Sequence, residues 1–216
     1  MPSSASHALR AKPRLDASAA GDPRRKWLDA FRTVRGESER RAAPLTPEDQ
    51  VIQSMADASP TKWHRAHTTW FFEQFLLVAH VADYRVFDER FAFLFNSYYV
   101  AAGPRHARPR RGLITRPDAG EVARYRAHVD AAVEKLIENA QAPVLEKLIP
   151  VIEIGLHHEQ QHQELILTDI LHAFAQNPTF PAYDAHWQMP RPQANERGFA
   201  DLPAGVHFIG HKGEGF

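Results

Sequence analysis

The chain has 216 residues, of which 44% are hydrophobic, enough for one sizeable domain and a smaller appendage. Its 26 Lys and Arg residues balance 26 Asp and Glu residues, so the bulk electrostatics favour neither nucleic acid nor an anionic membrane as a partner. The absence of cysteine excludes disulfides, thiolate nucleophiles and thiolate metal ligands, so any metal must be held by histidine and carboxylate groups.

The N-terminal stretch differs in composition from the rest of the chain. Residues 1–22 are rich in Ala, Ser, Pro and Arg without periodicity, which predicts a disordered N-terminus. This stretch lacks the hydrophobic core of a secretory signal, and no apolar run in the sequence is long enough to span a bilayer. We therefore expect a cytoplasmic protein with no membrane partner.

The first predicted helical segments follow from spacing and capping signals. Residues 23–41 carry apolar side chains at helical spacing among charged ones, which predicts an amphipathic helix. These apolar residues are Trp27, Leu28, Phe31 and Val34. Thr46, Pro47 and Asp49 then offer a capping hydroxyl, a proline at the first helical position and an acid in the first turn, so a short segment is expected there.

Ser59 and Pro60 repeat this signature as the expected cap and first residue of another helix. This helix contains His64 and His67 within an aromatic stripe at helical spacing, which is more often core packing than a cofactor site. The aromatic residues are Trp63, Trp70, Phe71 and Phe75.

Residues 87–118 form a long connection with two halves. The first half contains five apolar residues between Phe87 and Phe95 and predicts a buried turn or short helix. The second half, residues 103–117, is a loop with prolines, glycines and five arginines: Arg105, Arg108, Arg110, Arg111 and Arg116. A loop of this length in a compact domain is usually functional.

Two further helices complete the predicted domain. Asp118 opens a helix with an apolar stripe that ends near Ile137, and residues 144–175 predict one long helix closed by Asn177 and Pro178. Four main amphipathic helices without convincing alternating strands before residue 200 predict an all-α fold, a helical bundle over residues 23–180.

The C-terminal part has a different pattern. Residues 181–203 are rich in Pro, Gln and Arg, as in a linker, and residues 204–216 alternate apolar residues with glycines, as at the start of a strand and turn. A lone strand is not stable by itself. We therefore expect the sequence to stop at the opening of a second, α+β domain.

His158 and His162 are the strongest chemical signal in the chain. They are four residues apart on the long predicted helix, so both imidazoles lie on one face and can reach one metal ion. A third ligand must come from elsewhere, and His67 on the aromatic helix is the best candidate. Three neutral imidazoles leave positions open for a substrate atom and dioxygen, and they suit iron, copper, zinc and nickel alike.

The sequence HEQQH also fits the HExxH pattern of zinc proteases, in which Glu159 would be the general base. The extended protease pattern requires glycine at 165 and histidine at 168, where this chain has Leu165 and Thr168. The surrounding sequence therefore disfavours a protease.

Several separated motifs, in the same order, resemble the sulfoxide synthases of ergothioneine biosynthesis. They are residues 59–73 (SPTKWHRAHTTWFFE), 96–99 (NSYY), 103–117 (GPRHARPRRGLITRP) and 158–162 (HEQQH). These nonheme iron enzymes combine an N-terminal DinB-like four-helix bundle with a C-terminal domain like the formylglycine-generating enzyme. The resemblance covers about residue 26 to the end, and residues 205–216 resemble the first strand of that second domain.

The resemblance implies an oxygen-dependent C–S bond between hercynine and the thiol of cysteine or γ-glutamylcysteine, followed by oxidation to the sulfoxide. Cysteine is the favoured donor. It implies Fe²⁺ held by His67, His158 and His162, with His64 either behind the ligands or a packing residue. It also implies that Gln161 holds the substrate imidazole and that Tyr98 and Tyr99 supply hydroxyl groups to the oxygen chemistry.

For the loop arginines there is also a physical reason, because a guanidinium binds the carboxylate of an amino acid bidentately. Arg108 is the first choice for this role, followed by Arg105 and Arg111. Substrate binding in the resembling enzymes also draws on their second domain. The 216 residues are therefore expected to hold iron, whereas their turnover and the oligomeric state are left open.

Three function classes can be separated by structure. The iron oxygenase predicts a three-histidine site with the Arg and Tyr loop folded over it. A DinB-like bundle that binds zinc or nickel for another thiol transfer predicts the site without the loop. A noncatalytic binding or assembly module predicts histidines that do not converge, with His67 in the core and the other two at the surface.

Overall fold

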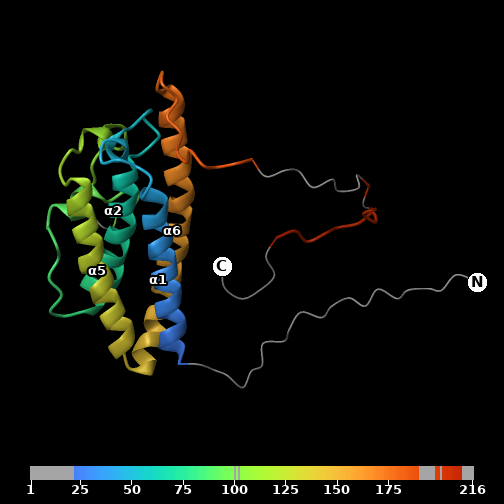
Figure 1. The fold of residues 1–216 in the computed structure, drawn as a ribbon. Helices are drawn as coiled ribbons and strands as arrows, with labels where there is room; N and C mark the ends of the chain where they lie inside the picture. Colours follow the sequence, from blue (N-terminus) through green and yellow to red (C-terminus); the bar gives the residue numbers. More distant parts are fainter. Residues whose placement is uncertain (1–21, 100, 102, 190–197, 200, 211–216) are drawn as a thin grey trace, which may run out of the picture.

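The computed structural model describes residues 22–99, 101, 103–189, 198–199 and 201–210. Within these ranges the fold is all-α, and four long helices stand side by side as a bundle (Figure 1). They are α1 (Pro23–Ala42), α2 (Thr61–Phe72), α5 (Ala119–Asn139) and α6 (Ala142–Gln176). The shorter helical segments are η1 (Asp49–Val51), η2 (Glu73–Leu77), α3 (Val78–His80), α4 (Phe91–Leu94) and η4 (Arg108–Leu113).

The ends of the long helices agree with the sequence signals. The side chain of Asp118 accepts a hydrogen bond from the backbone N–H of Glu121 and caps α5, as predicted. At the start of α1, Asp22 accepts from Arg24 in the same way and Pro23 occupies the first turn. The short segment expected near Asp49 is the single turn η1.

The predicted start of α2 was wrong by one residue. The helix begins at Thr61, and Pro60 is its extended N-cap without a side-chain cap. Ser59 does not cap the helix because its groups bond elsewhere. Its backbone N–H donates to Asp169 Oδ2 over 2.8 Å, and its hydroxyl accepts from Arg111 over 2.9 Å.

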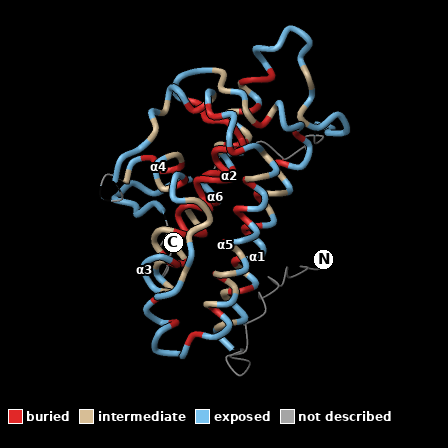
Figure 2. The backbone as a smooth tube through the Cα atoms, turned by 90° about the vertical axis from the view of Figure 1, so that its left-hand side faces the viewer, coloured by how far each residue is buried: buried red, intermediate tan, exposed pale blue. Residues whose placement is uncertain are grey.

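Helix α2 is the centre of the bundle. All twelve of its residues are buried, and Figure 2 shows buried positions gathered around it. It packs against both α5 and α6, while α1 packs mainly against α6. Trp63, Trp70 and Phe71 of the predicted aromatic stripe are buried in the core, as expected, whereas Phe75, in η2, is only partly buried against it.

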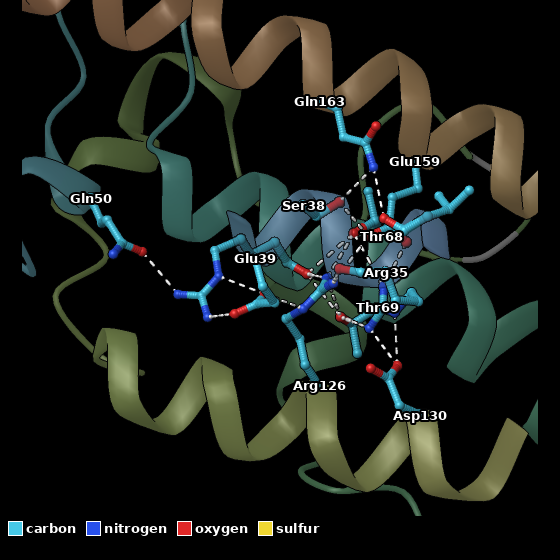
Figure 3. Close-up of polar contacts among 12 residues, drawn as sticks. Arg35, Ser38, Glu39, Gln50, Thr68, Thr69, Arg126, Asp130, Glu159 and Gln163 are labelled. Atoms are coloured by element: carbon cyan, nitrogen blue, oxygen red, sulfur yellow. Dashed lines mark hydrogen bonds and ion pairs between the residues drawn. The ribbon is translucent and has the colours of Figure 1, made fainter. Parts of the chain in front are cut away.

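A buried ionic network joins the four long helices beneath this core (Figure 3). Glu159 of α6 accepts hydrogen bonds from Arg35 of α1 over 2.8 Å, from Arg126 of α5 over 3.0 Å and from Ser38 over 2.6 Å. Arg35 also donates to Thr69 of α2 over 2.9 Å. A buried carboxylate is tolerated here because two guanidinium groups compensate its charge.

The predicted C-terminal strand is not found among the described residues. Residues 198–199 and 201–210 contain no strand, and no partner strand is available within the described ranges to satisfy its backbone groups. The opening of an α+β domain is therefore not seen. Residues 1–21, 190–197, 200 and 211–216, which include most of the expected disordered N-terminus and part of the linker, lie outside the described residues.

No helix among the described residues combines the length and the apolar character that crossing a bilayer requires.

Candidate metal centre

Three histidines from two helices converge where α2 packs against α6. One ring nitrogen from each of His67, His158 and His162 lies within 4.8 Å of the others. The ring centroids are 4.9 Å apart for His67 and His158, 4.7 Å for His67 and His162, and 4.6 Å for the pair on α6. The reading in which these histidines are unrelated core and surface residues is therefore wrong.

The close approach of α2 and α6 depends on a glycine one turn before the histidine pair. A Cβ atom at Gly155 would lie 2.6 Å from Phe72 and 2.9 Å from Phe71. Such distances are too short for any side chain, so the absence of a side chain at Gly155 lets the aromatic face of α2 lie against α6. This contact brings His67 within reach of His158 and His162.

In His67 and His162, a hydrogen bond to Nδ1 leaves the other ring nitrogen, Nε2, free for a metal. His67 Nδ1 lies 2.6 Å from the carbonyl oxygen of Phe95, which can only accept, so His67 donates through Nδ1 and keeps an unprotonated Nε2. His162 Nδ1 contacts His64 Nδ1 over 2.8 Å. His158 Nδ1 is buried without a hydrogen-bond partner among the described residues. The donor set therefore retains unused nitrogen atoms and fits a transition metal.

The electrostatics of the cluster also favour metal binding. Burial lowers the pKa of His67 and of His162 well below the usual histidine value, and the neighbouring imidazoles lower both further. Burial also lowers the pKa of His158 to about 4, although Glu159 opposes the shift. All three rings are therefore neutral near pH 7, the form that coordinates a metal.

Two tryptophans clamp the His67 ring. Trp63 stacks on it with centroids 4.6 Å apart, and Trp70 stacks with centroids 5.5 Å apart, both at 16° to its plane. The indole N–H groups donate to the carbonyl oxygens of Leu94 and Ala92, over 3.1 and 3.2 Å. Part of the aromatic stripe that the sequence assigned to packing therefore also fixes a candidate ligand.

The histidine cluster opens into a cavity of about 490 Å³. Most of the residues singled out in the sequence line it, and the loop after α4 supplies one wall. They are the three histidines with Tyr98, Tyr99, Arg108, Arg111 and Gln161. Arg105 instead lines an adjoining hollow of about 380 Å³, together with Arg108 and Arg111.

Arg111 is the buried cation of this cavity. Its guanidinium lies 3.4 Å from the centroid of the Trp63 ring and donates to the hydroxyls of Ser59 and Ser97 over 2.9 and 3.0 Å. Burial, with Arg108 nearby, lowers its pKa to about 10, so the group stays charged near neutral pH. It forms no salt bridge within the described part of the chain, and its buried Nε has no partner there.

Arg108, the first choice from the sequence, is only partly buried, and like Arg111 it has a buried Nε without a partner among the described residues. It donates to the Tyr98 hydroxyl over 2.6 Å and to the carbonyl oxygen of Asp57. It thereby ties the loop to Tyr98, which is 72% exposed at the cavity mouth. Because Arg111 is the more buried of the two and stacks on Trp63, it is better placed than Arg108 to receive a carboxylate.

Tyr99 lies deeper than Tyr98. It packs against Trp70 and Phe75, with centroids 5.6 and 5.1 Å away, and its ring centroid is 6.3 Å from that of His158. Burial raises the pKa of Tyr99, which keeps its hydroxyl protonated. Gln161 is an exposed residue of α6 at the rim of the same cavity.

One polar residue beside the cluster, Asp169, had no role assigned from the sequence. Asp169 Oδ2 contacts His64 Nε2 over 3.0 Å and also accepts from the Ser59 backbone. Asp169 lies seven residues after His162, two turns along the same helix face, which is the signal that could have revealed it.

Glu159 cannot act as the general base of a protease at this site. It is fully buried in the network of Arg35 and Arg126 rather than in the cavity. Burial opposes ionisation, yet the two guanidinium groups hold its pKa at about 2. A carboxylate with so low a pKa and no path to the cluster is a poor acceptor of a proton from water.

A larger depression of about 610 Å³ lies elsewhere, lined mainly by apolar side chains such as Leu77, Val81 and Leu136. None of the three clustered histidines lines it. We assign the functional site to the smaller cavity because there the potential ligands and the buried cation converge.

Comparison with known proteins gives one family. The family model described as the DinB superfamily matches residues 30–166, a segment that includes all three clustered histidines. A search of curated proteins gave no match.

Proposed function

The chain belongs to the DinB superfamily, and from this premise we propose that it is a nonheme iron(II) enzyme that uses dioxygen. In this proposal the enzyme joins hercynine to the thiol of cysteine, or of γ-glutamylcysteine, and oxidises the product to a sulfoxide. One C–H and one S–H bond are lost, one oxygen atom goes to sulfur and the other leaves as water.

The observation that carries the proposal is the shared cavity of the three neutral histidines and the Arg–Tyr loop. A metal-dependent thiol transferase needs the histidines but not this loop, and a noncatalytic module needs neither arrangement. The loop residues Tyr98, Tyr99 and Arg111 face the same space as the ligands. This combination supports the oxygenase over the two alternatives.

In the proposed reaction, His67, His158 and His162 hold the iron, which supplies the redox chemistry with dioxygen when bound. The protein's own groups bind and orient the substrates. Arg111 receives the carboxylate of an amino-acid substrate, because its guanidinium is charged, buried and without an acidic partner in the described residues. Gln161 orients the substrate imidazole from the rim.

The tyrosines are the proton donors of the proposal. The Tyr98 oxygen accepts from Arg108, so its own proton remains available to a second acceptor. The Tyr99 hydroxyl stays protonated and lies near the His158 ring. Either group can supply a proton as oxygen is reduced.

The test is metal content and oxygen uptake of protein prepared without oxygen and reconstituted with ferrous iron. Hercynine is added with cysteine or, separately, with γ-glutamylcysteine, and the product is identified by mass spectrometry. We expect thiol-dependent oxygen uptake and a sulfoxide, both lost in His162→Ala. Stoichiometric iron without product would contradict the oxygenase activity of this chain, and the absence of bound metal would contradict the site itself.

A further inference from the structure

His64 and Asp169 form a hydrogen-bonded chain behind one candidate metal ligand. Asp169 Oδ2 lies 3.0 Å from His64 Nε2, and His64 Nδ1 lies 2.8 Å from His162 Nδ1. His64 is 2% exposed and His162 is 9% exposed, so solvent has little access to either contact. These hydrogen bonds lead from Asp169, two turns after His162 on α6, to His64 on α2, and from there back to His162 on α6.

The chemistry of each group sets the direction of this chain. An ionised carboxylate only accepts hydrogen bonds, so His64 must donate to Asp169 through Nε2. The neutral ring of His64 then has an unprotonated Nδ1, which accepts. The contact between the two Nδ1 atoms therefore requires His162 to carry its proton on Nδ1, leaving Nε2 unprotonated.

The position of Asp169 is fixed by a second donor. The backbone N–H of Ser59 also donates to Oδ2, over 2.8 Å, just before α2 begins. Each ring nitrogen and the carboxylate oxygen in this series of hydrogen bonds therefore acts either as a donor or as an acceptor.

We propose that Asp169 and His64 are positioning residues that hold His162 in the Nδ1–H tautomer and present its Nε2 to the metal. The proposal rests on the metal centre of the proposed function. His67 has the equivalent support from the Phe95 carbonyl, whereas His158 has none among the described groups. Residues that orient a ligand in this way change metal affinity without touching the metal.

The test compares His64→Leu, which removes the acceptor, with His64→Asn, whose amide oxygen can occupy the position of Nδ1. The metal-free proteins are examined by ¹⁵N NMR for the tautomer of His162, and Co²⁺ affinity and the visible Co²⁺ spectrum are measured in titrations. His172→Leu is the control, because His172 is on α6 with His162 but bonds to Ser54 and not to the metal ligands.

We expect the wild type and His64→Asn to show the Nδ1–H tautomer of His162. In His64→Leu we expect loss of this tautomer, an altered Co²⁺ spectrum and a dissociation constant raised by about 10- to 100-fold. The control should match the wild type. If His64→Leu does not fold, as judged by thermal unfolding, Asp169→Ala should give a mixture of tautomers and weaker Co²⁺ binding.

Two results would overturn the positioning role. One is an Nε2–H tautomer of His162 in the wild type. The other is an unchanged tautomer and Co²⁺ affinity in the folded variants. A wild type with the Nδ1–H tautomer that binds no Co²⁺ would instead support the orienting chain and contradict the metal centre of the proposed function.

Discussion

Side chains that are close in the sequence near the cavity have different roles because they contact different partners. Glu159 follows His158 directly in the sequence, yet it points into the ionic network rather than into the cavity (Figure 3). Arg111 and Arg108 are three residues apart, yet Arg111 is buried against Trp63 whereas Arg108 is only partly buried and bonds to Tyr98. Each contrast gives a substitution that distinguishes a structural from a binding role.

Replacing Glu159 by Gln should destabilise the fold. The change leaves the buried guanidinium groups of Arg35 and Arg126 without their shared anion, which costs about 3–5 kcal/mol in comparable buried pairs. Urea denaturation measures the loss. Glu164→Gln, at an exposed position of the same helix, is the control and should stay within about 0.5 kcal/mol of wild type. A stable Glu159→Gln protein that bound iron normally but lacked activity would point to a chemical role for Glu159.

Replacing Arg111 by Lys should weaken binding of the carboxylate substrate. Lysine keeps the charge but loses the bidentate geometry and the stacking on Trp63. We expect KM for cysteine to rise roughly 10- to 100-fold, the equivalent of about 1.5–3 kcal/mol for a hydrogen bond to a charged group, with a smaller change in kcat. Steady-state kinetics of the iron-loaded protein test this. An effect confined to Arg108→Lys would restore the assignment made from the sequence.

Among the helices, the α2–α6 contact decides whether a metal centre exists. The two helices meet through aromatic side chains on α2 and the bare backbone at Gly155. His158 and His162 are fixed relative to one another by their own helix, but their distance to His67 depends on this packing. A change that spreads the two helices should therefore affect both stability and metal affinity.

Gly155→Ala tests this dependence. The added methyl group would overlap with Phe71 and Phe72, and overpacking of this kind costs about 1–3 kcal/mol. We also expect weaker Co²⁺ binding, because His67 is displaced from the pair on α6. Gly36→Ala, in α1, has nothing within 4 Å of the new methyl group and should be neutral or stabilising by up to about 1 kcal/mol. Equal stability of both variants would contradict the proposed role of Gly155.

For the whole molecule, metal binding and folding are linked because the ligands come from helices far apart in the sequence. His67 and the pair on α6 are separated by more than 90 residues, so the site exists only in the folded bundle. A metal that binds the folded state and not the unfolded chain must stabilise the fold.

Thermal unfolding with and without Co²⁺ measures this coupling independently of catalysis. At a metal concentration about 100 times the dissociation constant, the free energy of unfolding should rise by about 2.7 kcal/mol. For a chain of this size the midpoint should rise by roughly 5–10 °C. A chelator should reverse the shift and His67→Ala should abolish it. A shift that survived in His67→Ala would mean that the metal binds elsewhere.

The sequence by itself determined the helices and the ligand pair. Apolar periodicity and the cap at Asp118 describe interactions between residues close in the chain, so they could be identified without knowledge of the fold. The spacing of His158 and His162 is likewise a property of one helix. Residues of the long connection predicted to be functional line the same cavity as the histidines, and the roles of Tyr98, Tyr99 and Gln161 stay predictions.

Only the tertiary structure decided which groups surround those ligands. The directions of Glu159 and Arg111, the Phe95 carbonyl behind His67 and the chain from Asp169 to His162 each depend on contacts between distant segments. Local patterns fix which side of a helix is apolar, but not which polar groups meet when helices pack. Those contacts determine which carboxylate has its charge compensated, which guanidinium is buried in the cavity and which imidazole nitrogen remains available to a metal.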